Sequence, residues 1–535
     1  MRKLPANDRP CHHGSMIPTS NLSNLLFQAA QRHPERPALI RGGQTWTWAG
    51  LATRVRAAAA GLGARGVGKG DRVLVHATNG PALFATMWAT WALGAVWVPT
   101  NVRLTPAEVA YLAGSSRAAA HIVGAAFPDH AAAAAKANPA LRLSVAIGEG
   151  ALSWDGLATG SVLHETPADV DRDDPCWLFY TSGTTGRPKA GVLTHGQMAF
   201  VTLSHLCDLM PGTTERDVSL VVAPLSHGAG IHAVAQVARG AASVLPESET
   251  LDCAEAWRLV ERHRVTNMFT VPTILTMLTR DAAVDRHDHS SLRYVVYAGA
   301  PMFRADQQHA LRKLGRVLVQ YFGLGEVTGN ITVLPPHLHA AEDDPAVPIG
   351  TCGQARTGME IAILGPDGAR LATGGTGEIG VRGPAVFLGY ADNPVANAQA
   401  FRHGWFHTGD LGHLDERGFL FITGRASDMY ISGGSNVYPR EIEELLMLHP
   451  GVAEACVVGV PHPKWGESGV AVLVPRDGAR IDAAAVLAQL DGRLAKYKWP
   501  ARIEVWDALP KSGYGKVVKA DVRRLLAERP RPPEA

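Results

Sequence analysis

YTSGTTGRPKAGV, residues 180–192, is a loop rich in hydroxyl groups and glycine that lies between two apolar runs. The preceding run, CWLFY (176–180), predicts a buried strand, and the run that follows predicts the start of a second one. Gly183 and Gly186 can adopt positive φ angles, which lets backbone N–H groups converge. With the hydroxyl groups and the charge of Lys189, such a loop suits a polyphosphate.

Two other interpretations of this loop are a solvated polar hairpin and the P-loop of an ATPase. An ordinary turn does not need so many hydroxyl and glycine residues in succession. The P-loop pattern requires a glycine, four further residues and then Gly-Lys-Ser/Thr ahead of a helix. Here Gly186 is followed by Arg187 and Pro188, so that pattern is excluded.

The length and composition predict a protein of more than one domain. A chain of 535 residues exceeds the usual size of a single domain, and 46% hydrophobic residues are ample for large cores. The net charge of +2 gives no case for a nucleic-acid partner or an acidic membrane surface. The sequence has no apolar run long enough to span a bilayer, so integral membrane association is not expected.

The N-terminal residues and the cysteines favour a cytoplasmic location. The start, MRKLPANDRPCHHGSM, lacks the apolar stretch of a secretory signal. Residues 1–20 are expected to be a disordered tail, with Met16 as a candidate alternative start. The six cysteines form no Cys-x-x-Cys pair, which is typical of reduced thiols in a cytosol.

Apolar runs alternate with helical patterns along most of the chain, which predicts an α/β fold of mostly parallel sheets layered with helices. Residues 71–79 (DRVLVHATN) are an expected strand, followed by a helix over 82–93. In such sheets ligands bind at the carboxyl ends of the strands. His227, residues 299–302 and Glu326 follow predicted strands, which makes them candidates for a binding site.

The pattern changes after Asp410, where expected hairpins replace the alternation of strands and helices. A hairpin around two consecutive glycines is followed by an expected helix from Pro439. We predict a domain boundary near Ala426. The large domain then covers residues 21–426, and a small C-terminal domain over 427–535 can move against it.

Segments along nearly the whole chain resemble, in the same order, the motifs of the adenylate-forming superfamily. This superfamily comprises acyl-CoA synthetases, peptide-synthetase adenylation domains and luciferases. The segments are YTSGTTGRPKAG (180–191), PLSHGAG (224–230), GAPM (299–302), YFGLGE (321–326), GEIGVRGP (377–384), WFHTGDLG (405–412), GRASDMYISGGSNVYPREIE (424–443) and PKSGYGKVVK (510–519). Chance does not produce so many motifs in one order.

The resemblance implies an enzyme that activates a carboxylic acid with ATP and releases pyrophosphate. It also implies a distorted β-barrel in the large domain and a mobile α+β C-terminal domain. It assigns Lys516 to the α-phosphate and the attacking carboxylate. Glu326 and Thr184 are assigned to a Mg²⁺ ion between the β- and γ-phosphates, because a hard cation prefers oxygen ligands. The implied nucleotide contacts are Thr181, Ser182, Gly183, Thr184, Thr185, Lys189, Gly299, Ala300, Pro301, Phe322, Gly323, Asp410 and Arg425.

The resemblance also implies sites for the acyl group and for coenzyme A, with His227 as a catalytic residue beside the acyl group. Small acyl-pocket residues are expected to leave room for the acid, and polar ones to reach a hydroxyl or a second carboxylate. The expected acyl pocket is His227, Gly228, Ala229, His232, Leu324 and Asn330. The expected CoA contacts are Ser432, Gly433, Gly434, Arg440 and Trp465, and the expected hinge is Ser427.

Among several alternatives the sequence favours a CoA ligase. The segment VVAPLSHGAGIH (221–232) has no carboxylate to pair the ammonium group of an amino acid, and only about twenty residues follow Lys516, too few for a carrier domain. A medium-chain or longer fatty acid is the first expectation, and an aryl acid is the alternative. A ligase that loads a carrier protein and a catalytically silent adenylate-binding protein stay open, as does a homodimer.

Three positions depart from the family pattern. Gly325 stands where a threonine usually precedes the glutamate, Ser427 stands where the hinge residue is usually Asp or Lys, and Ala190 follows the loop lysine in place of glycine. We expect a threonine at position 325 to be tolerated, with overpacking as the risk. Thr328 is a candidate for the missing hydroxyl donor.

Overall fold

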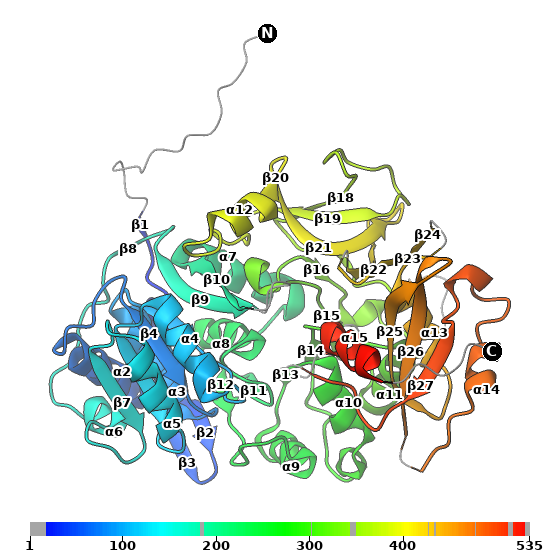
Figure 1. The fold of residues 1–535 in the computed structure, drawn as a ribbon. Coiled ribbons are helices and arrows are strands. Elements are labelled where there is room, and N and C mark those ends of the chain that lie inside the picture. Colours follow the sequence, from blue (N-terminus) through cyan, green and yellow to red (C-terminus); the bar gives the residue numbers. More distant parts are fainter. Residues whose placement is uncertain are drawn as a thin grey trace.

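The computed structural model describes residues 18–181, 187–300, 302–342, 349–425, 427–432, 435–476, 478–511 and 517–529. It confirms the predicted α/β fold. Figure 1 shows two helix-covered sheets (blue to green), an antiparallel sheet (yellow) above them and a C-terminal unit (orange to red) beside the green strands.

The first sheet has six strands in the order β10-β9-β5-β4-β6-β7. β10 runs antiparallel to β9, and the other neighbours run parallel. β9 and β10 are the two strands predicted around the hydroxyl-rich loop, and the strand and helix predicted over 71–93 are β4 and α3. The strands are β4 (Arg72–His76), β5 (Val96–Pro99), β6 (Ala120–Gly124), β7 (Leu143–Ile147), β9 (Pro175–Thr181) and β10 (Lys189–Thr194).

The second sheet has seven strands in the order β15-β14-β13-β11-β12-β2-β3. It is parallel except for the hairpin of β2 and β3. The carboxyl ends of its central strands therefore meet at one edge, which is where an α/β sheet binds ligands. The strands are β2 (Pro37–Arg41), β3 (Gln44–Thr47), β11 (Val218–Leu220), β12 (Ala242–Val244), β13 (Asn267–Thr270), β14 (Tyr294–Tyr297) and β15 (Leu318–Gln320).

The third sheet is the half-barrel that follows the two layered sheets. Its path is β18-β19-β21-β20, with β22 paired to β21, and every pair is antiparallel. Its strands are β18 (Glu360–Leu364), β19 (Gly377–Arg382), β20 (Phe401–Arg402), β21 (Trp405–Leu414) and β22 (Leu420–Arg425). Two short antiparallel pairs lie outside the sheets: β1 (Pro18–Thr19) with β8 (Val170–Asp171), and β16 (Thr332–Val333) with β17 (Gln354–Ala355).

The C-terminal sheet has its own hydrophobic core around Tyr430, and Phe303 of the large region packs against that core. The predicted glycine hairpin corresponds to the antiparallel pair β23 and β24, and the helix expected from Pro439 is α13. The strands are β23 (Tyr430–Ser432), β24 (Ser435–Val437), β25 (Val452–His462), β26 (Gly466–Pro475) and β27 (Arg502–Val505). The helices are α13 (Pro439–Leu446), α14 (Ala483–Ala488), η5 (Lys496–Lys498) and α15 (Lys519–Glu528).

The remaining helices cover the two parallel sheets and connect their strands (Figure 1). Among the described helices, not one has the length and apolar character to cross a membrane. The helices are α1 (Ser23–Arg32), α2 (Trp48–Gly63), α3 (Pro81–Ala92), α4 (Pro106–Ser116), α5 (Pro128–Ala137), α6 (Trp154–Ala158), α7 (His195–Ser204), η1 (His205–Leu209), α8 (Gly228–Arg239), α9 (Cys253–His263), α10 (Pro272–Arg280), η2 (Ala282–Asp285), α11 (Arg304–Leu314), η3 (Gly325–Val327), η4 (Pro336–Leu338) and α12 (Pro394–Ala400).

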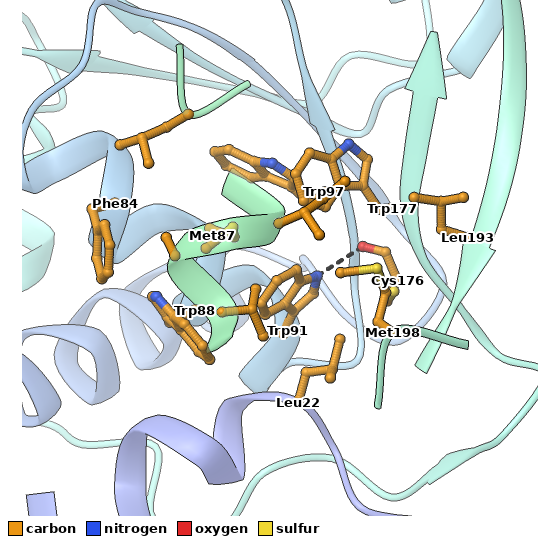
Figure 2. Packing of buried hydrophobic residues seen from close by; sticks show 14 of the residues in the cluster. Leu22, Phe84, Met87, Trp88, Trp91, Trp97, Cys176, Trp177, Leu193 and Met198 are labelled. Atoms are coloured by element: carbon orange, nitrogen blue, oxygen red, sulfur yellow. Dashed lines mark hydrogen bonds between the residues drawn. The ribbon is translucent and has the colours of Figure 1, made fainter. Parts of the chain in front are cut away.

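A tryptophan-rich core holds β9 against α3, as Figure 2 shows. Trp88 and Trp91 of α3 are fully buried, and the Trp91 ring centroid lies 6.4 Å from that of Trp177 on β9. Trp91 Nε1 also donates a hydrogen bond of 2.8 Å to the carbonyl oxygen of Cys176. Buried aromatic side chains stabilise a core by about 1.5–3 kcal/mol each. The strand that ends in the hydroxyl-rich loop is therefore rigidly anchored.

Candidate active site

Several of the described candidate residues end or follow strands of the two layered sheets. Thr181 is the last residue of β9, His227 follows β11, and Gly299 follows β14. Glu326 lies in the 3₁₀ helix η3, which comes after β15 and contacts β9 and β10. Two sheets and a loop therefore contribute to one site.

Glu326 is a buried carboxylate, with 6% of the residue exposed. Its Oε1 accepts hydrogen bonds from Thr181 Oγ1 at 3.0 Å and from the Tyr390 hydroxyl at 2.9 Å. Burial and the neighbouring Glu326 charge raise the pKa of Tyr390 well above its usual range, so this hydroxyl remains a donor. Lys189 Nζ lies 5.3 Å from the centre of the Tyr390 ring. The arrangement joins the two ends of the phosphate loop to Glu326.

The oxygen donors around Glu326 suit a magnesium ion. Within the described residues no hydrogen bond reaches Oε2 of Glu326, whereas Oε1 is bonded twice. A carboxylate with one oxygen held by hydroxyl donors and one oxygen available fits a hard cation that also binds phosphate oxygens. No group of three or more His, Cys, Asp or Glu side chains suited to a metal occurs in the described part of the chain. The ion would thus depend on phosphate and water for most of its ligands, as Mg²⁺ commonly does.

Asp410 and Arg425 face each other on neighbouring strands β21 and β22. Arg425 Nε donates a hydrogen bond of 3.0 Å to Asp410 Oδ1. The Asp410 side chain is 7% exposed and that of Arg425 is 49% exposed. The Asp410 charge raises the pKa of Arg425, so the guanidinium group keeps its charge. Asp410 belongs to a strand, and it is therefore not the turn residue that the segment Thr-Gly-Asp also suggests.

The turn after β14 begins with Gly299, whose φ of +86° suits glycine. Ala300 follows it and is half-buried. In the motif after β15, the Phe322 N–H donates to Thr332 Oγ1 at 3.2 Å. A Cβ atom at Gly323 would lie 2.3 Å from the Gly329 backbone, so this position requires glycine.

Gly325 leaves space that Phe179 fills. A Cβ atom at position 325 would lie 2.5 Å from Cδ1 of Phe179 and 3.1 Å from Cγ2 of Thr181. The Phe179 ring in turn lies 4.9 Å, centroid to centroid, from the His227 ring. The expectation that threonine is tolerated at position 325 is therefore wrong, because the added atoms would displace the phenylalanine that packs against His227.

Thr328 does not substitute for the missing threonine in this structure. Its side chain is buried, and its Oγ1 accepts a hydrogen bond of 3.4 Å from Gln197 Nε2 on α7. The hydroxyl is thus directed to α7. Leu324 precedes η3 and packs, half-buried, against the main hydrophobic core.

The small residues at the start of α8 pack closely against neighbouring segments. A Cβ atom at Gly228 would lie 2.5 Å from Cζ of Phe269, and one at Gly230 would lie 2.2 Å from the carbonyl oxygen of Leu225. Ala229 is buried in a cluster that also contains Phe269. Protein atoms therefore occupy the positions where Cβ atoms would lie, and glycine allows this close packing. The expectation that Gly228 and Ala229 line the acyl pocket stays a prediction.

A buried polar network surrounds His232. Its Nε2 is 2.9 Å from Asn267 Oδ1, and its Nδ1 is 3.4 Å from Nε2 of His205. Burial lowers the pKa of His232 to about 4 and that of His205 well below its usual range, so both rings are neutral. Both ring nitrogens of His232 therefore have protein partners in this network. The expectation that His232 lines the acyl pocket stays a prediction.

A second set of buried polar side chains continues from this network. Ser204, at the end of α7, donates to Asn330 Oδ1 at 3.3 Å and accepts from Arg356 Nη2 at 3.0 Å. Arg356 is also paired with Asp208 in the π-helical turn η1. Three buried nitrogen atoms in and beside this set find no hydrogen-bond partner among the described residues: His205 Nδ1, Asn330 Nδ2 and Arg356 Nη1. Such atoms are costly in a core, and they are common where a ligand or water completes the site.

The expected CoA residues lie on the C-terminal unit. Ser432 ends β23 and pairs with Gly466 of β26. Trp465 is 47% exposed, and Lys464 Nζ lies 4.7 Å from its ring centre. Arg440 donates to Glu444 within α13 at 2.6 Å, so its charge is already paired. The expected hinge residue, Ser427, is exposed.

Several expected residues lie outside the part of the chain that the structure describes. They are Ser182, Gly183, Thr184, Thr185, Pro301, Gly433, Gly434 and Lys516.

Sequence reasoning missed the aromatic residues of this site. Phe179 stands in the predicted strand, where an apolar residue signals only burial. Phe269 and Tyr321 also stand in or beside strands, and their rings lie 6.1 Å apart. Tyr390 lies in LGYADNP, which carries no local signal for a contact with Glu326, 64 residues away.

Comparison with known proteins identifies the family. The AMP-binding enzyme profile matches residues 26–391, and the AMP-binding enzyme C-terminal domain profile matches residues 441–516. The chain belongs to the AMP-binding enzyme family. It is an AMP-forming acid–thiol ligase, and ATP and CoA fit the substrates of such enzymes.

Its relatives include enzymes named for aromatic acids. The chain is 38% identical to a feruloyl-CoA synthase of Amycolatopsis sp over 507 residues, which cover 94% of this chain and 98% of that protein. It is 33% identical to an indoleacetate–CoA ligase of Aromatoleum aromaticum, over 95% of this chain and 98% of that protein. The solved structure of ATP-bound MatB from Rhodopseudomonas palustris is similar with a TM-score of 0.85 and 32% identity, over 94% of this chain and 98% of that chain.

Proposed function

We propose that this AMP-forming ligase couples an aromatic carboxylic acid with a polar ring substituent to coenzyme A. The observation that carries the proposal is a row of rings that leads away from Glu326. Phe179 packs on His227. Phe269 lies against Gly228, the residue that follows His227, and stacks on Tyr321 at a centroid distance of 6.1 Å. Rings of this kind suit an aromatic ligand because offset and edge-to-face contacts favour it. An aliphatic chain has no such preference.

The far end of the row is polar. The His205 ring lies 6.3 Å from that of Tyr321, and beside His205 lie the buried nitrogen atoms without a partner. A buried donor or acceptor favours a ligand that completes its hydrogen bond and discriminates against one that does not. This supports an acid with a hydroxyl or methoxy substituent, in agreement with the name of the feruloyl-CoA synthase relative. The fatty acid that the sequence alone favours becomes the second candidate.

In the first half-reaction, an oxygen of the acid carboxylate attacks the α-phosphorus of ATP. The bond from that phosphorus to the bridging oxygen breaks, and pyrophosphate leaves. Thr181 and Lys189 would bind the β- and γ-phosphates, and the Asp410–Arg425 pair would bind the ribose. A Mg²⁺ ion, held by Glu326 and Thr184, would supply positive charge against the phosphate oxygens. Positioning and electrostatic stabilisation carry this kind of catalysis.

In the second half-reaction, the thiol sulfur of CoA attacks the acyl carbon of the adenylate. AMP leaves, and the thiol proton is released. We propose a domain boundary at 426/427, so that the C-terminal domain presents Lys516 to the first step and Trp465 to the second. The exposed Trp465 ring with Lys464 at 4.7 Å would suit the adenine and phosphates of CoA.

The experiment is a pyrophosphate-release assay with a panel of acids, with and without CoA. The panel contains ferulate, cinnamate, indole-3-acetate, octanoate and dodecanoate, and thioester formation is followed by mass spectrometry. A buried hydrogen bond left unmade costs about 1–3 kcal/mol, so kcat/KM for ferulate should exceed that for cinnamate by about tenfold or more. Octanoate and dodecanoate should rank below both.

Other outcomes distinguish the alternatives. Higher kcat/KM for dodecanoate than for ferulate would favour a fatty-acid ligase. Pyrophosphate release that leaves the adenylate bound in the presence of CoA would favour loading of a carrier protein. Absence of release with every acid would favour a silent adenylate-binding protein.

A further inference from the structure

Tyr390 lies outside the motifs described above, and its side chain contacts Glu326, the proposed magnesium ligand. It lies between β19 and α12, after the core residue Phe387. Its hydroxyl donates to Glu326 Oε1 at 2.9 Å, a contact that closes a loop of 64 residues. The side chain therefore reaches the Glu326 carboxylate from the segment between β19 and α12. The same segment also holds the Glu326 backbone, because the Phe387 N–H donates a hydrogen bond of 2.8 Å to the Glu326 carbonyl oxygen.

The backbone of Tyr390 is held on two sides. Its N–H donates to Oδ1 of Asn397 at 2.6 Å, and Nδ2 of Asn397 donates back to its carbonyl oxygen at 2.9 Å. On the other side it forms a β-bridge with Gly191, two residues from Lys189 in β10. The ring also packs edge-on against Phe387, with centroids 4.9 Å apart. A side chain fixed in this way can fix its partner in turn.

The direction of the hydrogen bond decides which oxygen of Glu326 stays available. Oε1 accepts from Tyr390 and from Thr181, which occupies the two lone pairs of that oxygen. Oε2 receives no hydrogen bond from a protein donor among the described residues. The rotation of the carboxylate about its last bond is broad in the absence of such bonds, and two donors remove that freedom.

We propose that Tyr390 is a positioning residue that orients Glu326 for one-oxygen coordination of Mg²⁺ and supports Lys189 through its ring. The proposal rests on the proposed function, because it concerns the ATP site of that ligase. The Tyr390 hydroxyl fixes the orientation of the Glu326 carboxylate. The face of its ring lies beside the Lys189 ammonium group, which would bind the phosphates. Partners of this kind that hydrogen-bond a metal ligand typically change metal affinity by 10–100-fold when they are removed.

The test is binding of ATP to the full-length protein at several Mg²⁺ concentrations, measured by isothermal titration calorimetry without acid or CoA. Tyr390→Phe removes only the hydroxyl and keeps the ring beside Lys189. We expect the Mg²⁺ concentration that gives half-maximal ATP affinity to rise about tenfold. ATP affinity in EDTA should stay unchanged, because the variant retains the phosphate loop and the ribose pair.

Two further variants make the test specific. Tyr390→Leu removes the ring as well, and it should also weaken ATP binding in EDTA, because Lys189 loses its aromatic support. Tyr294→Phe is the matched control: Tyr294 begins β14, its hydroxyl donates to the carbonyl oxygen of Pro211 at 2.7 Å, and it should leave both measurements unchanged. Thermal melting of each variant establishes that it is folded.

The outcomes separate this inference from the proposed function. If the wild type binds ATP and Tyr390→Phe shows the same Mg²⁺ dependence, Tyr390 has no positioning role. A loss of ATP affinity in Tyr390→Phe that is equal with Mg²⁺ and with EDTA would also overturn it, because the hydroxyl would then act on the nucleotide or the fold. If the wild type itself does not bind ATP with Mg²⁺, the proposed function fails together with the inference.

Discussion

We predict that one residue, His121, makes a measurable contribution to the loss of folding stability at acid pH. This side chain lies on β6, is fully buried and belongs to a strand paired on both sides. Neither ring nitrogen has a hydrogen-bond partner among the described residues. Burial, followed by the nearby His130, lowers the pKa of His121 from 6.5 to about 4. The folded protein therefore holds this imidazole neutral at a pH where the unfolded chain protonates it.

The sign and size of the effect follow from this pKa difference. Below pH 6.5 the unfolded state binds more protons than the folded state, so stability is present above that pH and falls as pH falls toward 4. For this one group, the free energy of unfolding should drop by about 1.3 kcal/mol between pH 7.5 and 5.5. The loss should reach about 2.5 kcal/mol at pH 4.5.

His121→Leu tests this prediction, because leucine fills a similar volume and takes up no proton. Urea unfolding followed by tryptophan fluorescence gives the free energy of unfolding at pH 7.5, 6.5 and 5.5. Relative to its own value at pH 7.5, the variant should lose about 1.3 kcal/mol less than the wild type at pH 5.5. Buried histidines whose pKa does not depend on His121, such as His195 with a pKa of about 4, titrate in both proteins and cancel in the difference.

The matched control is His337→Leu, which changes an exposed histidine in η4 and should leave the pH dependence unaltered. A difference between wild type and His121→Leu that stays constant from pH 7.5 to 5.5 would refute the reasoning. The same holds if His337→Leu changes the pH dependence as much as His121→Leu.

Three further predictions concern the site. Gly325→Thr should cost about 1–3 kcal/mol of stability and strongly reduce adenylation, because it displaces Phe179. Adding Phe179→Leu in the same chain should restore part of the stability and part of the activity. A double variant no better than the single one would contradict this packing. Asp410→Asn should raise the dissociation constant of ATP about tenfold or more, since a charged hydrogen bond is worth about 1.5–3 kcal/mol, and calorimetry showing unchanged affinity would remove Asp410 from the ribose site. Lys516→Ala should slow adenylate formation by about 10²–10³ while synthetic acyl-adenylate and CoA still give thioester; equal slowing of both half-reactions would argue against a first-step role.

Local patterns predicted most of the fold. The apolar runs before and after residues 180–192 became β9 and β10, and the strand and helix expected over 71–93 became β4 and α3. Such features depend on the periodicity of neighbouring residues, which any one segment already contains. The sequence supported a fatty acid less well than it supported the fold. The small residues at the start of α8 do not indicate which segments pack next to them.

The sequence by itself determined the alternation of strands and helices, the α/β class and, through the resemblance of its motifs to a known family, the charged candidates Lys189, Glu326 and Asp410. The first two depend on the spacing of residues that are close in the chain, and the charged candidates follow from what the resemblance implies. Only the tertiary structure decided that Tyr390 bonds Glu326 and that Phe179 fills the space beside Gly325. The physical reason is that both contacts join segments more than 60 residues apart. Their distances are set by how sheets and helices pack, and local propensity carries no information about them.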